Sequence, residues 1–201
     1  MASGSSSSGG LEGIATQVKA VKGPPPVHLW NPPFCGDLDM RIAADGTWFY
    51  MKTPIGRPAL VKLFSSVLKR ENGRYFLVTP VEKVGITVDD APFAAVEMRV
   101  SGSGRARGIA LRTQTEEWVE VGPDHSLRFE KEAGTDGLKP YIHVRRDLWA
   151  RVSRALFQDL AALGEIASVE DSAGDRRDWF GLYAAGTFYP MVPAAEIEGL
   201  M

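Results

Sequence analysis

Residues 27–50 read VHLWNPPFCGDLDMRIAADGTWFY, and we expect the rest of the chain to be organised around them. This run brings together aromatic side chains, two prolines, the lone cysteine and two alternating aspartates. Its second half predicts a β-hairpin over 38–52, because Asp45-Gly46 favours the positive φ angles of a tight turn. The apolar and aromatic positions on either side of that turn are Met40, Ile42, Trp48 and Tyr50. The folded part of the chain is therefore expected to begin here.

The composition is that of a folded protein with no general affinity for nucleic-acid polymers or membranes. The chain has 201 residues, 44% of them hydrophobic and 24% charged, and a formal net charge of −2. So small a charge gives no overall attraction to nucleic-acid polymers or anionic membranes. No apolar run approaches the roughly 20 residues that cross a bilayer, and the N-terminus shows no secretory signal. We therefore expect a cytoplasmic protein.

Cysteine usage adds two exclusions. Cys35 is the single cysteine, so an internal disulfide and a cysteine-rich zinc site are both excluded. No cysteine-protease signature surrounds it, and we expect a buried, inert thiol.

The pattern divides the chain into a tail and two halves. Residues 1–26 begin with MASGSSSSGG, which predicts a flexible tail, and continue with a short helical pattern and a proline spacer. An N-terminal half follows over 27–90. A turn at 89–92 then separates it from a C-terminal half, residues 91–201.

Each half is expected to combine strands with one amphipathic helix. The first helix is predicted over 58–70, where Asn72-Gly73 stops it, and the second over 146–163, where Gly164 ends it. The fold class is therefore α+β, with two small domains and largely antiparallel sheets. The other predicted strands are 75–78, 84–88, 93–100, 107–113, 117–121, 126–130, 141–144, 165–169 and 179–184, with a last edge at 188–191.

An arginine stands at the start of each predicted helix, which points to an internal repeat. Aligning Arg57 with Arg146 also aligns Leu60 with Trp149 and Val67 with Leu156. This matching indicates duplicated strand-helix-strand units. Similar apolar spacing also arises in any strand-helix-strand unit, so both interpretations stay open.

Four linked motifs resemble the bacterial domain-of-unknown-function-1285 family. They are PPVHLWNPPFCGD at 25–37, DGTWFY at 45–50, TPIGR at 53–57 and VTPVEK at 78–83. The similarity covers nearly everything after the tail. It implies a duplicated α+β core, a C-terminal half superficially similar to pleckstrin-homology folds, and a ligand site between the halves. It also implies a nucleotide-like ligand and a role in signal transduction, and it supplies no catalytic residues.

Asp37 and Asp39 are the candidate acidic site. They alternate along a predicted strand, so both should point to one face. Two carboxylates on one face could bind Mg²⁺ or Ca²⁺, or share a proton in acid–base work. The alternative is a turn in which they accept hydrogen bonds from backbone amides.

Arg57 and Arg146 are the candidate cations. Each begins a predicted helix, and helix N-termini with an adjacent arginine are suited to anions. If the two halves face each other, both guanidinium groups could flank one cleft. The alternative for Arg57 is an ion pair with Asp39 or Glu82 that holds the hairpin on the helix.

Three further residues complete the predicted ligand site. Glu82 and Lys83 follow Thr79-Pro80 between two predicted strands, where a polar pair serves recognition or lies in a solvated turn. Trp48 either stacks on a base or belongs to the core.

The favoured hypothesis is a non-catalytic sensor or adaptor that binds a small anionic, nucleotide-like ligand between the halves. It names no catalytic residue, metal or cofactor. One alternative is a metal-assisted hydrolase that uses Asp37 and Asp39. The other is a protein-interaction module, with a protein partner or a second copy of the chain bound to it.

Overall fold

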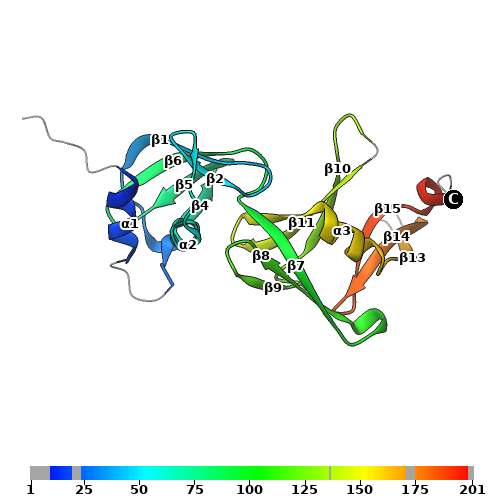
Figure 1. Cartoon of the computed structure of the whole chain (residues 1–201). Helices are drawn as coiled ribbons and strands as arrows, with labels where there is room; N and C mark the ends of the chain where they lie inside the picture. The colour runs from blue at the N-terminus through cyan, green and yellow to red at the C-terminus, as the bar shows by residue number, and fades with distance from the viewer. Residues whose placement is uncertain (1–9, 20–23, 136, 171–174, 199–201) are drawn as a thin grey trace, which may run out of the picture. The chain divides into compact units, whose positions relative to one another are not determined.

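The computed structural model describes residues 10–19, 24–135, 137–170 and 175–198. Contacts divide the chain into two compact units, an N-terminal unit Met1–Asp90 and a C-terminal unit Ala91–Met201. The predicted flexible tail lies outside the described residues except for Gly10. Strands dominate both units and the helices are few and short (Figure 1), so the predicted α+β class fits only loosely.

The N-terminal unit contains one six-stranded sheet and two short α-helices. Its elements are α1 (Leu11–Lys19), η1 (Val27–Leu29), β1 (Phe34–Ile42), β2 (Trp48–Tyr50), β3 (Thr53–Pro54), α2 (Pro58–Ser66), β4 (Leu68–Glu71), β5 (Arg74–Val78) and β6 (Lys83–Val88). The strand order is β3-β2-β1-β6-β5-β4. The central pair β1 and β6 is parallel, and every other neighbouring pair is antiparallel. The predicted N-terminal helix is present as α1, which contacts α2.

The hairpin predicted over 38–52 is confirmed by β1 and β2. Gly46 has φ 88° in the connecting turn, and the Asp45 carboxylate accepts a hydrogen bond from the Thr47 amide at 2.9 Å. That hydrogen bond lowers the pKa of Asp45. Ile42 and Trp48, directly paired across the hairpin, are 0% and 2% exposed. Burial of these apolar side chains on one face fixes the register of the hairpin.

The first predicted helix is too long. It ends at Ser66 instead of residue 70, and β4 begins at Leu68. Asn72 and Gly73 both have positive φ, 50° and 80°, and join β4 to β5. A two-residue turn with two positive φ angles suits a tight β-hairpin. Asn72-Gly73 is therefore the turn of the β4–β5 hairpin and not the end of a helix.

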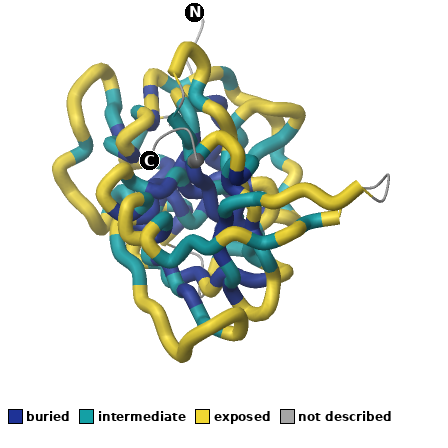
Figure 2. The backbone as a smooth tube through the Cα atoms, turned by 90° about the vertical axis from the view of Figure 1, so that its right-hand side faces the viewer, coloured by how far each residue is buried: buried dark blue, intermediate teal, exposed yellow. Residues whose placement is uncertain are grey.

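The C-terminal unit contains a six-stranded sheet and a three-stranded sheet. Its elements are β7 (Phe93–Ser101), η2 (Gly104–Ala106), β8 (Gly108–Thr113), β9 (Trp118–Glu120), β10 (Leu127–Lys131), β11 (Leu138–Arg145), β12 (Leu148–Val152), α3 (Arg154–Ala161), β13 (Glu165–Glu170), β14 (Arg176–Ala184), β15 (Thr187–Pro193) and α4 (Ala194–Glu198). The strand orders are β10-β11-β12-β7-β8-β9 and β13-β14-β15. Helix α3 contacts β7 and β14. In Figure 2 the exposed backbone is concentrated in loops and hairpin tips, and the buried stretches in the interior.

The second predicted helix is wrong over its first half. Residues 148–152 form β12, in which Leu148, Ala150 and Val152 are buried and alternate with less buried residues. The helix begins only after Ser153, whose hydroxyl accepts a hydrogen bond from the Leu156 amide. Arg146 therefore lies in the turn between β11 and β12, with φ 52°, and opens no helix.

The two six-stranded sheets have the same strand order. In each sheet, the first and sixth strands are parallel neighbours at the centre. The second and then the third strand follow outward from the first, and the fifth and then the fourth follow outward from the sixth. The helices do not correspond, because α2 precedes the fourth strand of its sheet and α3 follows the sixth. The alignment of Arg57 with Arg146 is therefore wrong, while duplication and the pleckstrin-homology likeness stay predictions.

Candidate functional site

Asp37 of β1 and Lys83 of β6 lie on neighbouring strands of the N-terminal unit. The Asp37 carboxylate accepts from the Arg74 guanidinium at 2.7 Å, and a Cβ at Gly85 would lie 2.0 Å from the Asp37 Oδ1 atom. Any side chain at position 85 would collide with the Asp37 carboxylate, so only glycine is compatible with this position of Asp37. The Arg74 guanidinium also lies over two phenylalanine rings, 5.7 Å from Phe34 and 5.3 Å from Phe76.

Glu71 joins two lysines on the same sheet. Lys69 Nζ lies 2.7 Å and Lys83 Nζ 2.9 Å from the Glu71 carboxylate. Hydrogen bonds from these two lysines lower the pKa of Glu71 below its ordinary value of 4.5. Lys83 is thus engaged in an internal network, and a ligand there would have to compete with Glu71.

Asp37 and Asp39 are both exposed and alternate along β1 with the less exposed Leu38 and Met40, as expected for two residues on one face of a strand. The register of β1 against β6 shifts between Asp37 and Arg41. Among the described residues, no group of three or more His, Cys, Asp or Glu could hold a metal ion. The metal-assisted hydrolase therefore stays a prediction. Among the described residues, no third His, Cys, Asp or Glu joins Asp37 and Asp39 as a metal ligand.

Glu82 and Trp48 are buried. Glu82 is 8% exposed and accepts a hydrogen bond from the Gln17 amide group at 2.9 Å, which ties α1 to the loop before β6. Trp48 is 2% exposed, and its Nε1 atom has no hydrogen-bond partner among the described residues. In this structure both residues contribute to the interior of the unit.

Cys35 differs from its prediction. The thiol is exposed instead of buried, and its Sγ atom lies 3.5 Å from the carbonyl oxygen of Pro33. The physical reason is that β1 begins with exposed residues, Phe34 and Cys35, before its buried segment.

Arg57 and Arg146 belong to different units, and the prediction that they flank one cleft stays a prediction. Arg57 immediately precedes α2 and lines a hollow of about 260 Å³ with Thr16 and Lys19 of α1. Burial and the neighbouring Arg145 lower the pKa of the Arg146 guanidinium.

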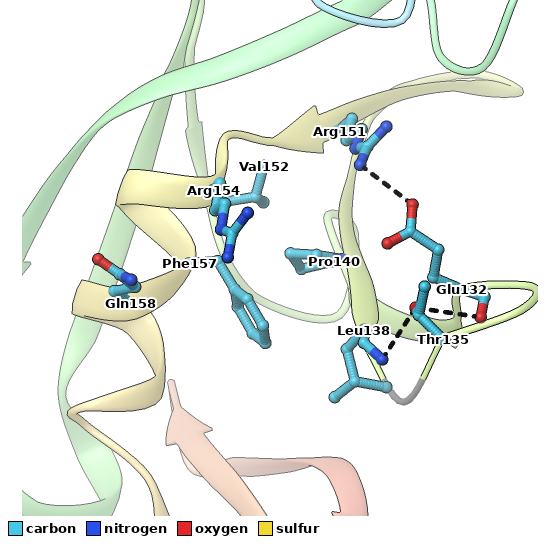
Figure 3. A pocket seen from close by; sticks show the side chains of 10 residues that line it. Glu132, Thr135, Leu138, Pro140, Arg151, Val152, Arg154, Phe157 and Gln158 are labelled. Atoms are coloured by element: carbon cyan, nitrogen blue, oxygen red, sulfur yellow. Dashed lines mark hydrogen bonds and ion pairs between the residues drawn. The ribbon is translucent and has the colours of Figure 1, made fainter.

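A larger hollow lies in the C-terminal unit, between the β10–β11 hairpin and α3 (Figure 3). Its volume is about 680 Å³. Leu138 and Pro140 of β11 line one side and Phe157 of α3 lines the other, so part of the wall is apolar. Arg151 at the end of β12 and Arg154 at the start of α3 add two guanidinium groups.

The charged groups of this hollow are unbalanced. Among its described lining residues, Glu132 is the single carboxylate against the two arginines. That carboxylate lies 3.9 Å from Arg151 and 3.5 Å from Lys139. Arg154 is exposed and forms no ion pair or hydrogen bond with a described residue. The hollow therefore has positive charge available for a bound anion.

Sequence reasoning missed Arg151 and Arg154, because a helix predicted over 146–163 placed both on a continuous helical surface. The signal was Ser153, a good N-cap residue preceded by the alternating pattern Leu148-Trp149-Ala150-Arg151-Val152. That pattern predicts a strand followed by a helix, with Arg151 and Arg154 on either side of the junction.

Comparison with known protein families shows to which family the chain belongs. Residues 25–91 match the N-terminal domain of the domain of unknown function DUF1285, and residues 92–191 match the C-terminal domain of the protein of unknown function DUF1285. The chain belongs to the DUF1285 family. The resemblance of its four motifs is thereby confirmed.

A solved structure agrees with this DUF1285 membership. A crystal structure of a DUF1285 family protein from Silicibacter pomeroyi DSS-3 is 50% identical, with a TM-score of 0.82, over 94% of this chain and 98% of that one. A second, from Shewanella baltica OS155, is 26% identical with a TM-score of 0.49, over 62% of this chain and 91% of that one. Comparison with curated proteins finds no match.

In the part of this DUF1285 chain that the structure describes, no helix is both long and apolar enough to cross a membrane.

Proposed function

We propose that the C-terminal unit binds a small anionic, nucleotide-like ligand in the hollow between the β10–β11 hairpin and α3. On this proposal the protein acts as a sensor or adaptor in signal transduction and not as an enzyme. The observation that carries it is the pairing of two guanidinium groups, Arg151 and Arg154, with an apolar wall.

The size and chemistry of the hollow support this choice. Small-molecule sites usually occupy about 300–1,000 Å³, are largely apolar and carry a few converging polar groups. Arginine presents a planar fork of donors that matches the oxygens of phosphate or carboxylate. Phe157 offers an aromatic ring for a flat part of the ligand, and it is itself supported by Phe129, 6.2 Å away between ring centroids.

A thermal-shift and calorimetric screen of nucleotides tests the proposal. A ligand present at 100 times its Kd should add about 2.7 kcal/mol of apparent stability. Arg154→Ala should weaken binding roughly tenfold or more, because a charge-assisted hydrogen bond is lost. The fold should persist, since Arg154 has no partner among the described residues.

Arg176→Ala is the matched control. It removes the same charge from an exposed strand of the same unit, where Arg176 pairs with Glu170 at 3.6 Å. Its ligand affinity should equal that of the wild type. The proposal fails if no nucleotide binds at millimolar concentration, or if the two arginine variants bind equally well.

A further inference from the structure

A second hollow, of about 720 Å³, lies on the exposed face of β7, β8 and β9. Ala110 stands in the middle strand, with Arg99 of β7 directly on one side and Glu120 of β9 on the other. The alternate residues of β8 and β9, such as Leu111 and Val119, are buried on the opposite face. The sheet thus presents a small residue between two long charged ones.

The floor of this hollow consists of residues with little or no side chain, Gly108 and Ala110. Gly108 precedes Ala110 on the same face of β8, and a Cβ at position 108 would lie 2.6 Å from the Ser101 hydroxyl oxygen. Neighbouring strands lie about 4.8 Å apart, so the backbones of Arg99 and Glu120 are separated by roughly 10 Å across the floor. That width accepts a flat ring lying on Ala110.

The Arg99 side is held in place by its neighbours. The Arg99 guanidinium lies 4.0 Å from the centroid of the Trp118 ring and 3.7 Å from the Glu97 carboxylate. Glu97 is fixed in turn by Arg112, at 2.6 Å. A guanidinium carries five N–H donors, so donors remain for a ligand after these contacts.

The Glu120 side offers the opposite chemistry. Glu120 is exposed and its carboxylate has no hydrogen-bond or ion-pair partner among the described residues. An ionised carboxylate can only accept hydrogen bonds. A ligand on this floor therefore needs acceptors on the edge facing Arg99 and donors on the edge facing Glu120, in a flat body that lies on Ala110.

We propose that this face is a binding site for a guanine base. Guanine carries O6 and N7 acceptors on one edge, which suit an arginine fork, and its adjacent edge carries N–H donors that suit a carboxylate. Adenine presents a donor beside N7 and lacks the second acceptor, so it matches less well. The Arg99 guanidinium lies over the half-buried Trp118 ring, which keeps this fork in place for the base.

Calorimetry with guanosine and adenosine on the full chain tests the proposal without engaging phosphate. Guanosine should bind at least tenfold more tightly than adenosine, and Glu120→Gln should weaken guanosine roughly tenfold. Ala110→Leu should abolish binding by filling the floor. Arg176→Ala should leave guanosine binding unchanged, because Arg176 pairs with Glu170 and lines neither hollow.

The variants are compared after far-UV circular dichroism and thermal melting show that they are folded. Equal affinity for both nucleosides, or no heat at millimolar guanosine, overturns the guanine assignment. If guanosine binds equally well after both Glu120→Gln and Ala110→Leu, the base does not bind on this face of the sheet. None of these results depends on the Arg151–Arg154 hollow, so the two proposals can fail separately.

Discussion

Glu71 shows at the residue scale how a half-buried charge network becomes specific. Two lysines, Lys69 and Lys83, reach its carboxylate from β4 and β6, and Lys83 also lies 5.2 Å from the centroid of the Phe76 ring. Pairs of this kind are worth about 0.2–1 kcal/mol each in exposed settings. Their value here is mainly to orient Lys83, because Glu71 reaches it from β4 across the intervening strand β5.

The lowered pKa of Glu71 predicts a pH dependence. The Glu71 carboxylate binds a proton less tightly in the folded protein than in the unfolded chain, where it has its ordinary pKa of 4.5. The stabilisation is therefore complete above that value and is lost as the pH falls through the lower folded-state pKa. Glu71→Gln should cost about 1 kcal/mol at pH 7, and the difference from wild type in urea unfolding should shrink toward pH 3.

Glu165→Gln is the control for that titration, because Glu165 has no ion-pair partner among the described residues. It should differ from the wild type by less than about 0.5 kcal/mol at every pH. A Glu71→Gln deficit that stays constant from pH 7 to pH 3 would contradict the assignment of the network to ionised Glu71.

At the scale of elements, the β4–β5 hairpin depends on its turn. Gly73 has φ 80°, a conformation that costs other residues roughly 1–2 kcal/mol, and no atom stands within 4 Å of a Cβ built there. Gly73→Ala should therefore lower the free energy of unfolding by about 1 kcal/mol through backbone strain alone. Chemical denaturation of the full chain measures it.

Gly56→Ala provides the matched control. Gly56 also has open space around its Cβ position, and its φ is not positive. The substitution should be neutral or stabilise by up to about 1 kcal/mol, because alanine reduces the entropy of the unfolded chain. Equal effects at both positions would show that the turn between β4 and β5 is not strained for alanine.

The same hairpin explains which elements could be predicted from the sequence. The β1–β2 hairpin was predictable because Asp45-Gly46 and the alternating apolar residues indicate the same structure. The β4–β5 hairpin was missed because Phe64, Val67 and Leu68 continue helical spacing past the end of α2. Pairing of Leu68 with Leu77 decides the outcome, and such a tertiary contact overrides local spacing.

At the scale of the whole molecule, the candidate sites depended on which residues the sheets bring together. Asp37 and Lys83 were predicted from the sequence because polar residues next to turns and prolines stand out locally. Arg99 and Glu120 could not be found in that way, since their relation runs through Ala110 in a strand between them. Strand register carries this information, and the sequence pattern predicts strands more readily than their pairing partners.

The division into two units predicts separate local stabilities. Leu77 and Leu111 are both 0% exposed, one in the core of each unit. Each change to alanine removes the same side chain and should cost about 2–5 kcal/mol through lost burial and a cavity. Hydrogen exchange followed by mass spectrometry should show Leu77→Ala reducing protection mainly in residues 24–90, and Leu111→Ala mainly in residues 91–198. Because the two variants are each other's control, equal loss of protection in both units from either substitution would mean that the chain opens as one cooperative body.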